Sequence, residues 1–272
     1  MMNARRPYVA GAFYPDDRNE LLKMLDLYMS QDFPQIKFKK IIGIIVPHAG
    51  YIYSGSTAAY AYNILRGIEK HDFIIIGPNH YGYPRHPSIY PDGFWETPLG
   101  DAKVDSDLSK VLIKKSGIIQ EDREAHDIEH SIEVQIPFLQ YIFNNNFEFA
   151  PIILGDQSMH TAKSIAETIY SLNRIPPVII SSDLNHYLSY DENNRNDDII
   201  INDILKLNLT RYYDDINQYD ITACGFGAIA VLMYITKRMG GKIRILHHSN
   251  SGDAFGDKRR VVGYGAFLSY IE

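Results

Sequence analysis

The sequence predicts an α/β fold, with a single layered domain in which helices flank a mostly parallel central sheet. Short apolar runs alternate along the chain with segments whose apolar residues recur at helical spacing. The runs at 40–46 and 73–76 are rich in isoleucine, which is typical of strands buried on both faces. The 272 residues are 45% hydrophobic, enough for one continuous core, and no linker divides 1–272.

The first third of the chain shows the order helix, strand, helix, strand. A Pro-Asp-Asp sequence begins a predicted helix over 18–31, where leucines and methionines recur at helical spacing. The run 40–46 predicts a central strand, because its residues are β-branched and apolar. A second helix over 56–68 leads to the strand at 73–76 and completes a unit with a right-handed crossover.

The middle of the chain begins with an irregular segment. Residues 81–104 are rich in proline, glycine and aromatic residues, which favours a hairpin or folded loop that could wall a pocket. Helical spacing resumes over 105–115 and 130–143, and Pro137 is expected to kink the second of these helices. Beyond this point the pattern predicts strands at 148–154, 177–182, 243–247 and 261–269, and helices at about 158–172, 198–208 and 225–238.

Composition excludes several classes of function. The net charge is −6 and the sequence pI is about 5.9, so neither a nucleic-acid partner nor a cationic membrane arm is indicated. No apolar run reaches the roughly 18 residues of a membrane span, and the first 15 residues lack the apolar core of a signal peptide. Phosphate loops, paired cysteines and hydrolase elbows are also absent from the sequence. We therefore expect a cytosolic protein that acts on a small or polar ligand.

Three histidines each follow an apolar run that is predicted to be a buried strand. His48 follows IIGIIVP, His80 follows FIIIGPN, and His186 follows VIISSDLN, in which Asp183 is the acidic residue. The carboxyl ends of parallel strands meet at one edge of a sheet. These side chains are therefore expected to converge and to form an active site.

Cys224 is the only cysteine and lies where a turn opens into an apolar helix. The helix dipole favours a thiolate there, and the small neighbours Ala223, Gly225 and Gly227 allow close backbone approach. A reactive or metal-binding thiol and a small core residue are both consistent with this context. With two imidazoles and a carboxylate nearby, the thiol would complete a metal site.

Two further groups have alternative interpretations. His186 is predicted to be a general acid or base held by Asp183, whereas Asp183 could instead cap a helix and leave His186 on the surface. His130, together with Glu129 and Glu133, could support the metal ligands through hydrogen bonds or could simply begin a solvated helix. We predict the supporting role for His130 and Glu133.

The sequence resembles the Memo family, and in particular its microbial AmmeMemoRadiSam system protein B branch. The motifs that carry the resemblance span nearly the whole chain and are VPHAGYIYSG, GPNHYG, FWETPLGD, EHSIEVQIPFLQY, SSDLNHY and ACGFGAIA. Proteins of this family are similar to LigB-type class III extradiol ring-cleavage dioxygenases. The resemblance implies one α/β domain with a pocket at one edge of the sheet.

The resemblance also implies roles for the site residues. In those dioxygenases two histidines and a glutamate hold iron(II). The family pattern keeps the histidines as His48 and His80 and places Cys224 where the carboxylate would be. His186 is similar to the acid/base histidine, and Asp183 matches a further pocket position. Because a thiolate is softer than a carboxylate, copper or zinc would suit the site as well as iron, and ring cleavage does not follow from the fold.

The expected function is metal-dependent redox chemistry, with iron(II) or copper as the favoured cofactor and zinc as the alternative. His48, His80 and Cys224 are the predicted ligands. Catalysis is assigned to His186 and Asp183, together with the same Cys224. A structural zinc site is weakened by the open, glycine-rich surroundings.

A second prediction is a module that carries metal or binds a peptide without catalysis. Its pocket would be walled by the aromatic residues Tyr51, Tyr53, Trp95 and Tyr187, which suit recognition as well as catalysis. Tyr51 and Tyr53 are expected in a loop bracketed by glycines. The partner would be a small molecule or a peptide, and the resemblance adds a pathway link to AMMECR-type and radical SAM proteins.

Overall fold

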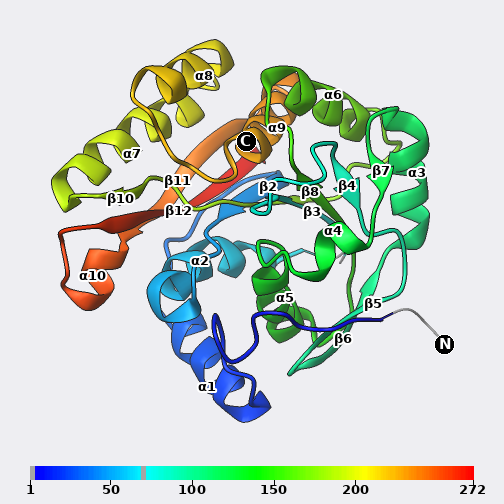
Figure 1. Ribbon diagram of the computed structural model, residues 1–272, viewed down its shortest axis with the longest axis horizontal. Coiled ribbons are helices and arrows are strands. Elements are labelled where there is room, and N and C mark those ends of the chain that lie inside the picture. Colours follow the sequence, from blue (N-terminus) through cyan, green and yellow to red (C-terminus); the bar gives the residue numbers. More distant parts are fainter. Residues whose placement is uncertain (1–3, 69–71) are drawn as a thin grey trace.

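Figure 1 shows the computed structural model as a central sheet with helices on both faces. The structure describes residues 4–68 and 72–272. The middle of the sheet is parallel, and its strands in spatial order are β6 (Gly100–Val104), β8 (Glu148–Leu154), β3 (Asp72–Pro78), β9 (Val178–Ser181) and β2 (Lys40–Val46). The predicted α/β fold with a mostly parallel central sheet is therefore confirmed.

Antiparallel strands extend the sheet beyond β2. The long strand β12 (Val261–Ile271) pairs with β2 and also with β11 (Lys242–Asn250) and β10 (His186–Leu188). The two longer strands were predicted. The strand β10 was not predicted. It is only three residues long, and so short a segment shows no alternation of apolar and polar residues.

The opposite edge is built from the segment predicted to be a hairpin or loop. Within 81–104, β5 (Phe94–Thr97) pairs antiparallel with β6, and β1 (Ala4–Arg5) adds to β5. The short strand β4 (Ser88–Ile89) pairs with β8, and β7 (Gln120–Glu121) pairs with β4. The hairpin prediction is confirmed.

Helices cover both faces of the sheet (Figure 1). One face packs against α1 (Arg18–Met29), α2 (Tyr51–Leu65) and α5 (Ile136–Phe143). The other packs against α3 (Ser106–Ser116), α6 (Met159–Tyr170), α7 (Tyr190–Leu205), α8 (Leu209–Gln218) and α9 (Phe226–Arg238). The connections contain the short helices α4 (Glu124–Asp127), η1 (Glu133–Gln135) and α10 (Ser251–Phe255). Each helix of the described part of the chain is too short or too polar to cross a membrane.

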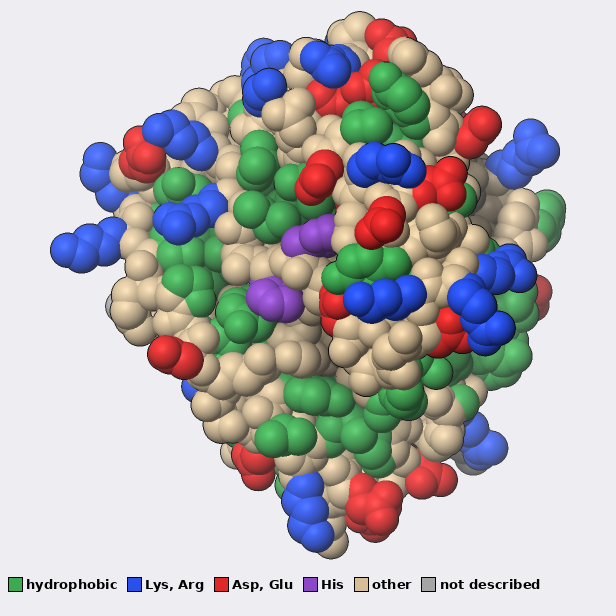
Figure 2. Space-filling model, turned by 90° about the vertical axis from the view of Figure 1, so that its left-hand side faces the viewer, with side chains coloured by type: hydrophobic (Ala, Val, Ile, Leu, Met, Phe, Trp, Pro, Cys, Tyr) green, Lys and Arg blue, Asp and Glu red, His purple; other side chains and the backbone are tan. Residues whose placement is uncertain are grey.

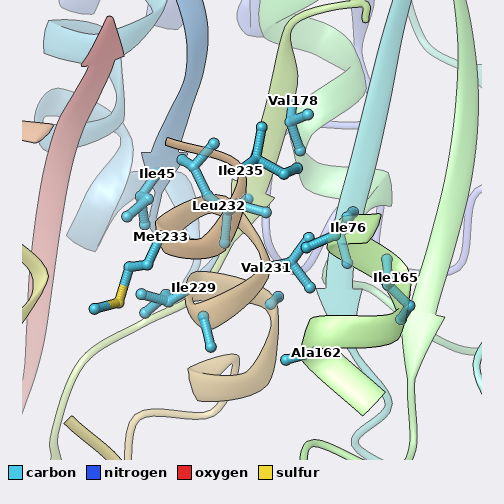
Figure 3. Packing of buried hydrophobic residues seen from close by; sticks show 14 of the residues in the cluster. Ile45, Ile76, Ala162, Ile165, Val178, Ile229, Val231, Leu232, Met233 and Ile235 are labelled. Carbon is cyan, nitrogen blue, oxygen red and sulfur yellow. The ribbon is translucent and has the colours of Figure 1, made fainter. Parts of the chain in front are cut away.

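Two hydrophobic cores lie on either side of the sheet, because side chains alternate along each strand. On β3, Ile74 and Ile76 face the α9 side, whereas Phe73 and Ile75 face the α2 side. Figure 3 shows Leu232 and its neighbours on α9 packed against strand residues from β2, β3 and β9. Each such fully buried side chain contributes roughly 1.5–3 kcal/mol relative to an exposed one. The two cores fix the strands whose ends carry the site.

The start of α2 corrects the prediction of a loop around Tyr51 and Tyr53. The helix begins at Tyr51, directly after Gly50, so both tyrosines lie in its first turn. Gly55 does not end a loop here. It stands inside the helix because a Cβ atom would come within 2.5 Å of the Tyr28 ring, so glycine lets the two helices approach closely.

Two other predictions are corrected. Pro137 does not kink a helix, since it occupies the first turn of α5, where no backbone N–H is needed. The helix predicted over 198–208 begins already at Tyr190, because the polar stretch before it is helical as well. The helix α8 was not predicted.

Strands β2 and β3 follow one another along the chain in the predicted unit, but β9 lies between them in the sheet.

Candidate metal centre

The predicted convergence at one edge of the sheet is observed. His48 follows β2, Asp183 follows β9 and His80 follows β3, and these three parallel strands are neighbours. Cys224 comes to the same place from the segment before α9. One donor atom from each of His48, His80 and Cys224 lies within 4.8 Å of the other two. The structure thus brings together the three residues expected to hold a metal.

The ring of His48 is oriented by a buried serine. Its Nδ1 lies 2.9 Å from Ser181 Oγ, which donates its only hydrogen to the Ser131 carbonyl. Gln135 Nε2 also donates to this oxygen, at 2.9 Å. Ser181 must therefore accept from His48, so Nδ1 carries the proton and Nε2 keeps a free lone pair. That Nε2 lies 3.0 Å from the sulfur of Cys224.

The ring of His80 is oriented by a buried glutamate. Glu129 is 1% exposed, and its Oε1 lies 2.9 Å from His80 Nδ1. Its other oxygen accepts from the His80 backbone N–H at 2.7 Å. Burial raises the pKa of Glu129, but the hydrogen bond and charge of His80 outweigh it and hold the pKa at about 2. An ionised carboxylate accepts only, so Nδ1 of His80 is the protonated nitrogen and Nε2 is free.

Cys224 is held by contacts to the end of β9. The backbone N–H of Asp183 points to its sulfur at 3.3 Å, and the Gly225 N–H donates to Ser182 Oγ at 2.9 Å. A Cβ atom at Gly225 would lie 2.7 Å from Ser182 Cβ and from the Ser181 carbonyl oxygen, so only glycine permits this approach. Burial raises the pKa of the Cys224 thiol, and the charge of Asp183 raises it further. A bound cation would offset both effects and favour the thiolate.

Asp183 holds the loop after β2. Its Oδ1 accepts the backbone N–H of His48 at 2.8 Å and of Ala49 at 3.3 Å, and its Oδ2 lies 4.0 Å from His48 Nε2. Burial raises the pKa of Asp183, against the charge of His186 and the two backbone donors. The hydrogen bonds of Oδ1 thus hold the loop of His48, and the role of Asp183 toward His186, or as a further ligand, stays a prediction.

His186 is oriented instead by Thr222. The His186 backbone N–H donates to Thr222 Oγ1 at 2.8 Å, and its Nδ1 donates to the Thr222 carbonyl at 2.9 Å. Because a carbonyl accepts only, the proton is on Nδ1 and Nε2 is free to accept one. Burial lowers the pKa of His48 and raises the pKa of Asp183, and the charge that His186 would carry acts on both groups, so its ring lies within electrostatic range of them.

His130 lies beside the two ligand rings. It stacks on His80 with ring centroids 4.5 Å apart and meets His48 edge-on at 5.4 Å. Its Nδ1 is 3.5 Å from Glu129 Oε1. Burial, followed by the charge of His48, lowers the pKa of His130 to about 4, so this ring is neutral near pH 7. His80, Glu129 and His130 form a second group of donor atoms within 4.8 Å of one another.

Glu133 does not support the metal ligands, which corrects its predicted role. Its carboxylate lies 2.8 Å from Arg5 Nη1 and accepts hydrogen bonds from Tyr14 and from the backbone of Tyr8 and Val9. These partners all belong to the N-terminal segment. Glu129, four residues earlier, makes the contact that was expected of Glu133.

The predicted aromatic wall divides into two pairs. Tyr51 and Trp95 are 3% and 1% exposed and belong to the core, which corrects the prediction that they face a ligand. Trp95 is covered by Arg5 at 4.3 Å, because the hairpin turns the indole inward. Tyr53 and Tyr187 are 42% and 63% exposed and remain available. The Tyr187 ring lies 5.6 Å from that of His186.

Sequence reasoning missed four residues around the centre. Ser181 and Gln135 orient His48, Thr222 orients His186, and the buried Tyr264 lies close enough to Asp183 that the carboxylate charge raises its pKa, although burial raises it more. The two serines that follow an apolar strand at 181–182 were a usable signal, because small polar residues at a strand end face the same edge as the ligands. No comparable pattern marks the other three.

The donor set is suited to particular metals. Two imidazole nitrogens and a thiolate favour iron, copper or zinc over magnesium or calcium, which prefer oxygen ligands. Hydrogen bonds fix both imidazoles in the tautomer that a metal requires, as is usual for metal-binding histidines. The arrangement of His48, His80 and Cys224 therefore fits a metal ion with coordination positions left open for another ligand.

Comparison with known proteins identifies the family of this chain. A family model described as Memo-like protein matches residues 5–268. A MEMO1 family protein of Thermoplasma volcanium is 48% identical over 97% of this chain and 98% of its own length. A MEMO1 family protein of Thermoplasma acidophilum is 45% identical over 98% of this chain and 99% of its own, and one of Desulfurococcus amylolyticus is 42% identical over 99% and 100%. The chain therefore belongs to the Memo-like protein family.

Proposed function

We propose that this protein binds a redox-active metal ion through His48, His80 and Cys224 and uses it in the oxidation of a small molecule. The observation that carries the proposal is the pair of fixed tautomers. Ser181 and Glu129 each occupy the Nδ1 proton of a histidine, so both Nε2 lone pairs are available beside the thiol.

The charges around the centre favour a divalent ion, and among redox-active metals we favour iron(II). The Cys224 thiolate and the Glu129 carboxylate each contribute one negative charge. A divalent ion offsets these two charges, which avoids the cost of burying an uncompensated charge.

The bound metal would supply electron transfer and polarisation of a ligand at its open positions. The chain itself supplies the proton acceptor. His186 Nε2 is free because Thr222 holds Nδ1–H, so it can take a proton from a hydroxyl group of the substrate. Tyr53 and Tyr187 are 42% and 63% exposed and offer aromatic surface to a ligand beside their contacts with Phe255 and Arg260.

A second candidate is a copper(I)-carrying protein without catalysis. The soft sulfur of Cys224 beside two imidazoles favours it, because copper(I) prefers thiolate ligands. This candidate needs neither His186 nor an open coordination position.

The first experiment is elemental analysis of protein purified anaerobically under reducing conditions. His48→Ala, His80→Ala and Cys224→Ser are compared with the wild type and with His160→Ala, a control at an exposed histidine. About one iron or copper per chain is expected in the wild type and control and loss in the other three variants. Equal metal content in all five proteins, or none in the wild type after anaerobic reconstitution, would contradict the proposed site.

A second experiment separates the two candidates. Oxygen uptake is measured with dihydroxylated aromatic compounds and with other reductants, for the wild type and for His186→Gln. The oxidoreductase predicts uptake in the wild type and a loss of about 10²–10⁴-fold in His186→Gln, whose metal content stays unchanged. Copper retention without uptake in either protein would favour the carrier.

A further inference from the structure

Asp197 is a buried carboxylate that the proposed chemistry does not use. It lies on α7, is 0% exposed and accepts three hydrogen bonds. Its Oδ1 accepts the backbone N–H of Asn185 at 3.0 Å and the side-chain amide of Asn185 at 2.8 Å. Its Oδ2 accepts from His248 Nε2 at 2.9 Å. Asp197 therefore fixes both the backbone and the side chain of the residue that precedes His186.

Asn185 transmits this constraint to Thr222. Its side-chain oxygen accepts the Thr222 backbone N–H at 3.3 Å, and its own carbonyl accepts the Gly263 N–H at 2.8 Å. Thr222 in turn holds His186 at two points, through its hydroxyl and its carbonyl. A continuous chain of hydrogen bonds thus runs from His248 through Asp197, Asn185 and Thr222 to His186.

The surroundings of Asp197 leave little freedom for another arrangement. A Cβ atom at Gly263 would overlap Asp197 Oδ2, so glycine is required where β12 passes the carboxylate. The other end of the chain is open to solvent, because the side chain of His248 is 23% exposed. Figure 2 shows histidine side chains reaching the surface on the side that carries α7, β10 and α10, with hydrophobic side chains beside them.

We propose that Asp197 is a positioning residue for His186. Through Asn185 and Thr222 it holds the imidazole in the Nδ1–H tautomer, which leaves Nε2 as the proton acceptor at the metal centre. The inference rests on the proposed function, because the tautomer matters only if His186 transfers a proton. Asp197 would then influence proton transfer although it contacts neither the metal nor the substrate.

Nuclear magnetic resonance of the histidine side chains tests this inference directly. Full-length, metal-free protein with ¹⁵N-labelled histidine is studied at about pH 8.5, two units above the ordinary imidazole pKa. The wild type should show His186 as the Nδ1–H tautomer. In Asp197→Asn the ratio of the two tautomers should move toward Nε2–H by on the order of fivefold, the value of about one hydrogen bond. The control is Asp198→Asn at the exposed neighbouring residue, which should match the wild type.

A second pair of variants keeps the test decisive if Asp197→Asn does not fold. Thr222→Val removes the hydroxyl that binds the His186 backbone and should shift the tautomer ratio, whereas Thr222→Ser keeps the hydroxyl and should restore the wild-type spectrum. An unchanged His186 tautomer in folded Asp197→Asn, or in Thr222→Val, would overturn the inference. The metal content of the same proteins tests the ligands independently, so failure of the proposed metal site and failure of the positioning role give different results.

Discussion

Glu129 and Glu133 lie four residues apart, and each is 1% exposed, yet their carboxylates have different partners. Glu129 binds the ring and backbone of His80, at the metal centre. Glu133 binds the guanidinium of Arg5 and the backbone of the N-terminal segment. One buried carboxylate therefore orients a candidate ligand, and the other holds the chain terminus in place.

Arg5 joins these two regions. Its Nη1 contacts the Glu133 carboxylate, and its Nη2 donates to the backbone carbonyl of Glu129 at 2.8 Å. Its Nε donates to the His126 carbonyl at 2.7 Å. The contrast teaches that burial and charge alone do not identify a residue that supports a metal site. The role of a buried carboxylate depends on the group that it contacts. Matched substitutions of the two glutamates should therefore separate effects on stability from effects on metal binding.

The largest effect is expected from Glu133→Gln. The change leaves the buried Arg5 guanidinium without its carboxylate, and breaking a buried ion pair costs about 3–5 kcal/mol. The free energy of unfolding, measured by urea denaturation, should fall by that amount, whereas the metal content of the folded protein should stay at the wild-type value. Loss of metal from folded Glu133→Gln would show that the two regions are not separable.

A loss of stability in acid should come from His126, which lies beside Arg5. Burial, followed by the charge of Arg5, lowers the pKa of His126 to about 3. In the unfolded chain His126 titrates near 6.5, so between these values the unfolded state binds the extra proton. The His126 contribution is complete above pH 6.5 and is lost as the pH falls toward 3, by about 1.4 kcal/mol per pH unit.

Urea denaturation at a series of pH values checks this expectation. His126→Gln keeps a donor for the Ser88 carbonyl that His126 Nε2 contacts at 3.2 Å and cannot be protonated. Its stability should depend less steeply on pH than that of the wild type over the same window. Parallel curves for the two proteins would exclude His126 as the source.

Glu129→Gln should weaken metal binding rather than folding. Substitution of a residue that orients a metal-binding histidine typically lowers affinity by about 10–100-fold, because the ring is no longer held in one tautomer. Affinity can be measured by competition with a chelator of known strength. An effect on affinity as small as that of Glu133→Gln would contradict the role assigned to Glu129.

A smaller effect in the same direction is expected from Ser181→Ala. The substitution removes the acceptor of the His48 Nδ1 proton, a neutral hydrogen bond of about 1 kcal/mol, or roughly fivefold in metal affinity. The same competition assay measures it. Ser109→Ala is the matched control, since this serine is also 0% exposed but lies on α3.

Much of the fold and the ligand set could be predicted from the sequence, because the information is local. Apolar runs such as 40–46 identify buried strands, and the residues that follow them, His48 and His80, must lie at the edge of the sheet where parallel strands end. Cys224 was found from its place before an apolar helix. The strand ends indicated the two histidines, whereas the choice of Cys224 as a ligand over a core residue came from the family resemblance.

The supporting residues could not be predicted, because their roles depend on partners distant in the sequence. The role of Glu129 follows from its contact with His80, which is 49 residues away in the sequence. The role of Glu133 follows from its contact with Arg5, which is 128 residues away. Trp95 was expected on a pocket wall, but the hairpin brings its ring under the Arg5 guanidinium instead. The wrong predictions for Glu133 and Trp95 both arise from contacts with the N-terminal segment. The sequence of that segment shows no helical or strand periodicity.

The most direct test of the account is the absorption spectrum of the protein reconstituted anaerobically with cobalt(II), which reports on thiolate ligation without requiring a substrate. We predict a thiolate-to-metal charge-transfer band in the wild type and in Glu133→Gln, a weaker cobalt affinity in Glu129→Gln, and no such band in Cys224→Ser. Wild-type protein that binds cobalt without this band, or that binds none, would contradict a metal centre formed by His48, His80 and Cys224.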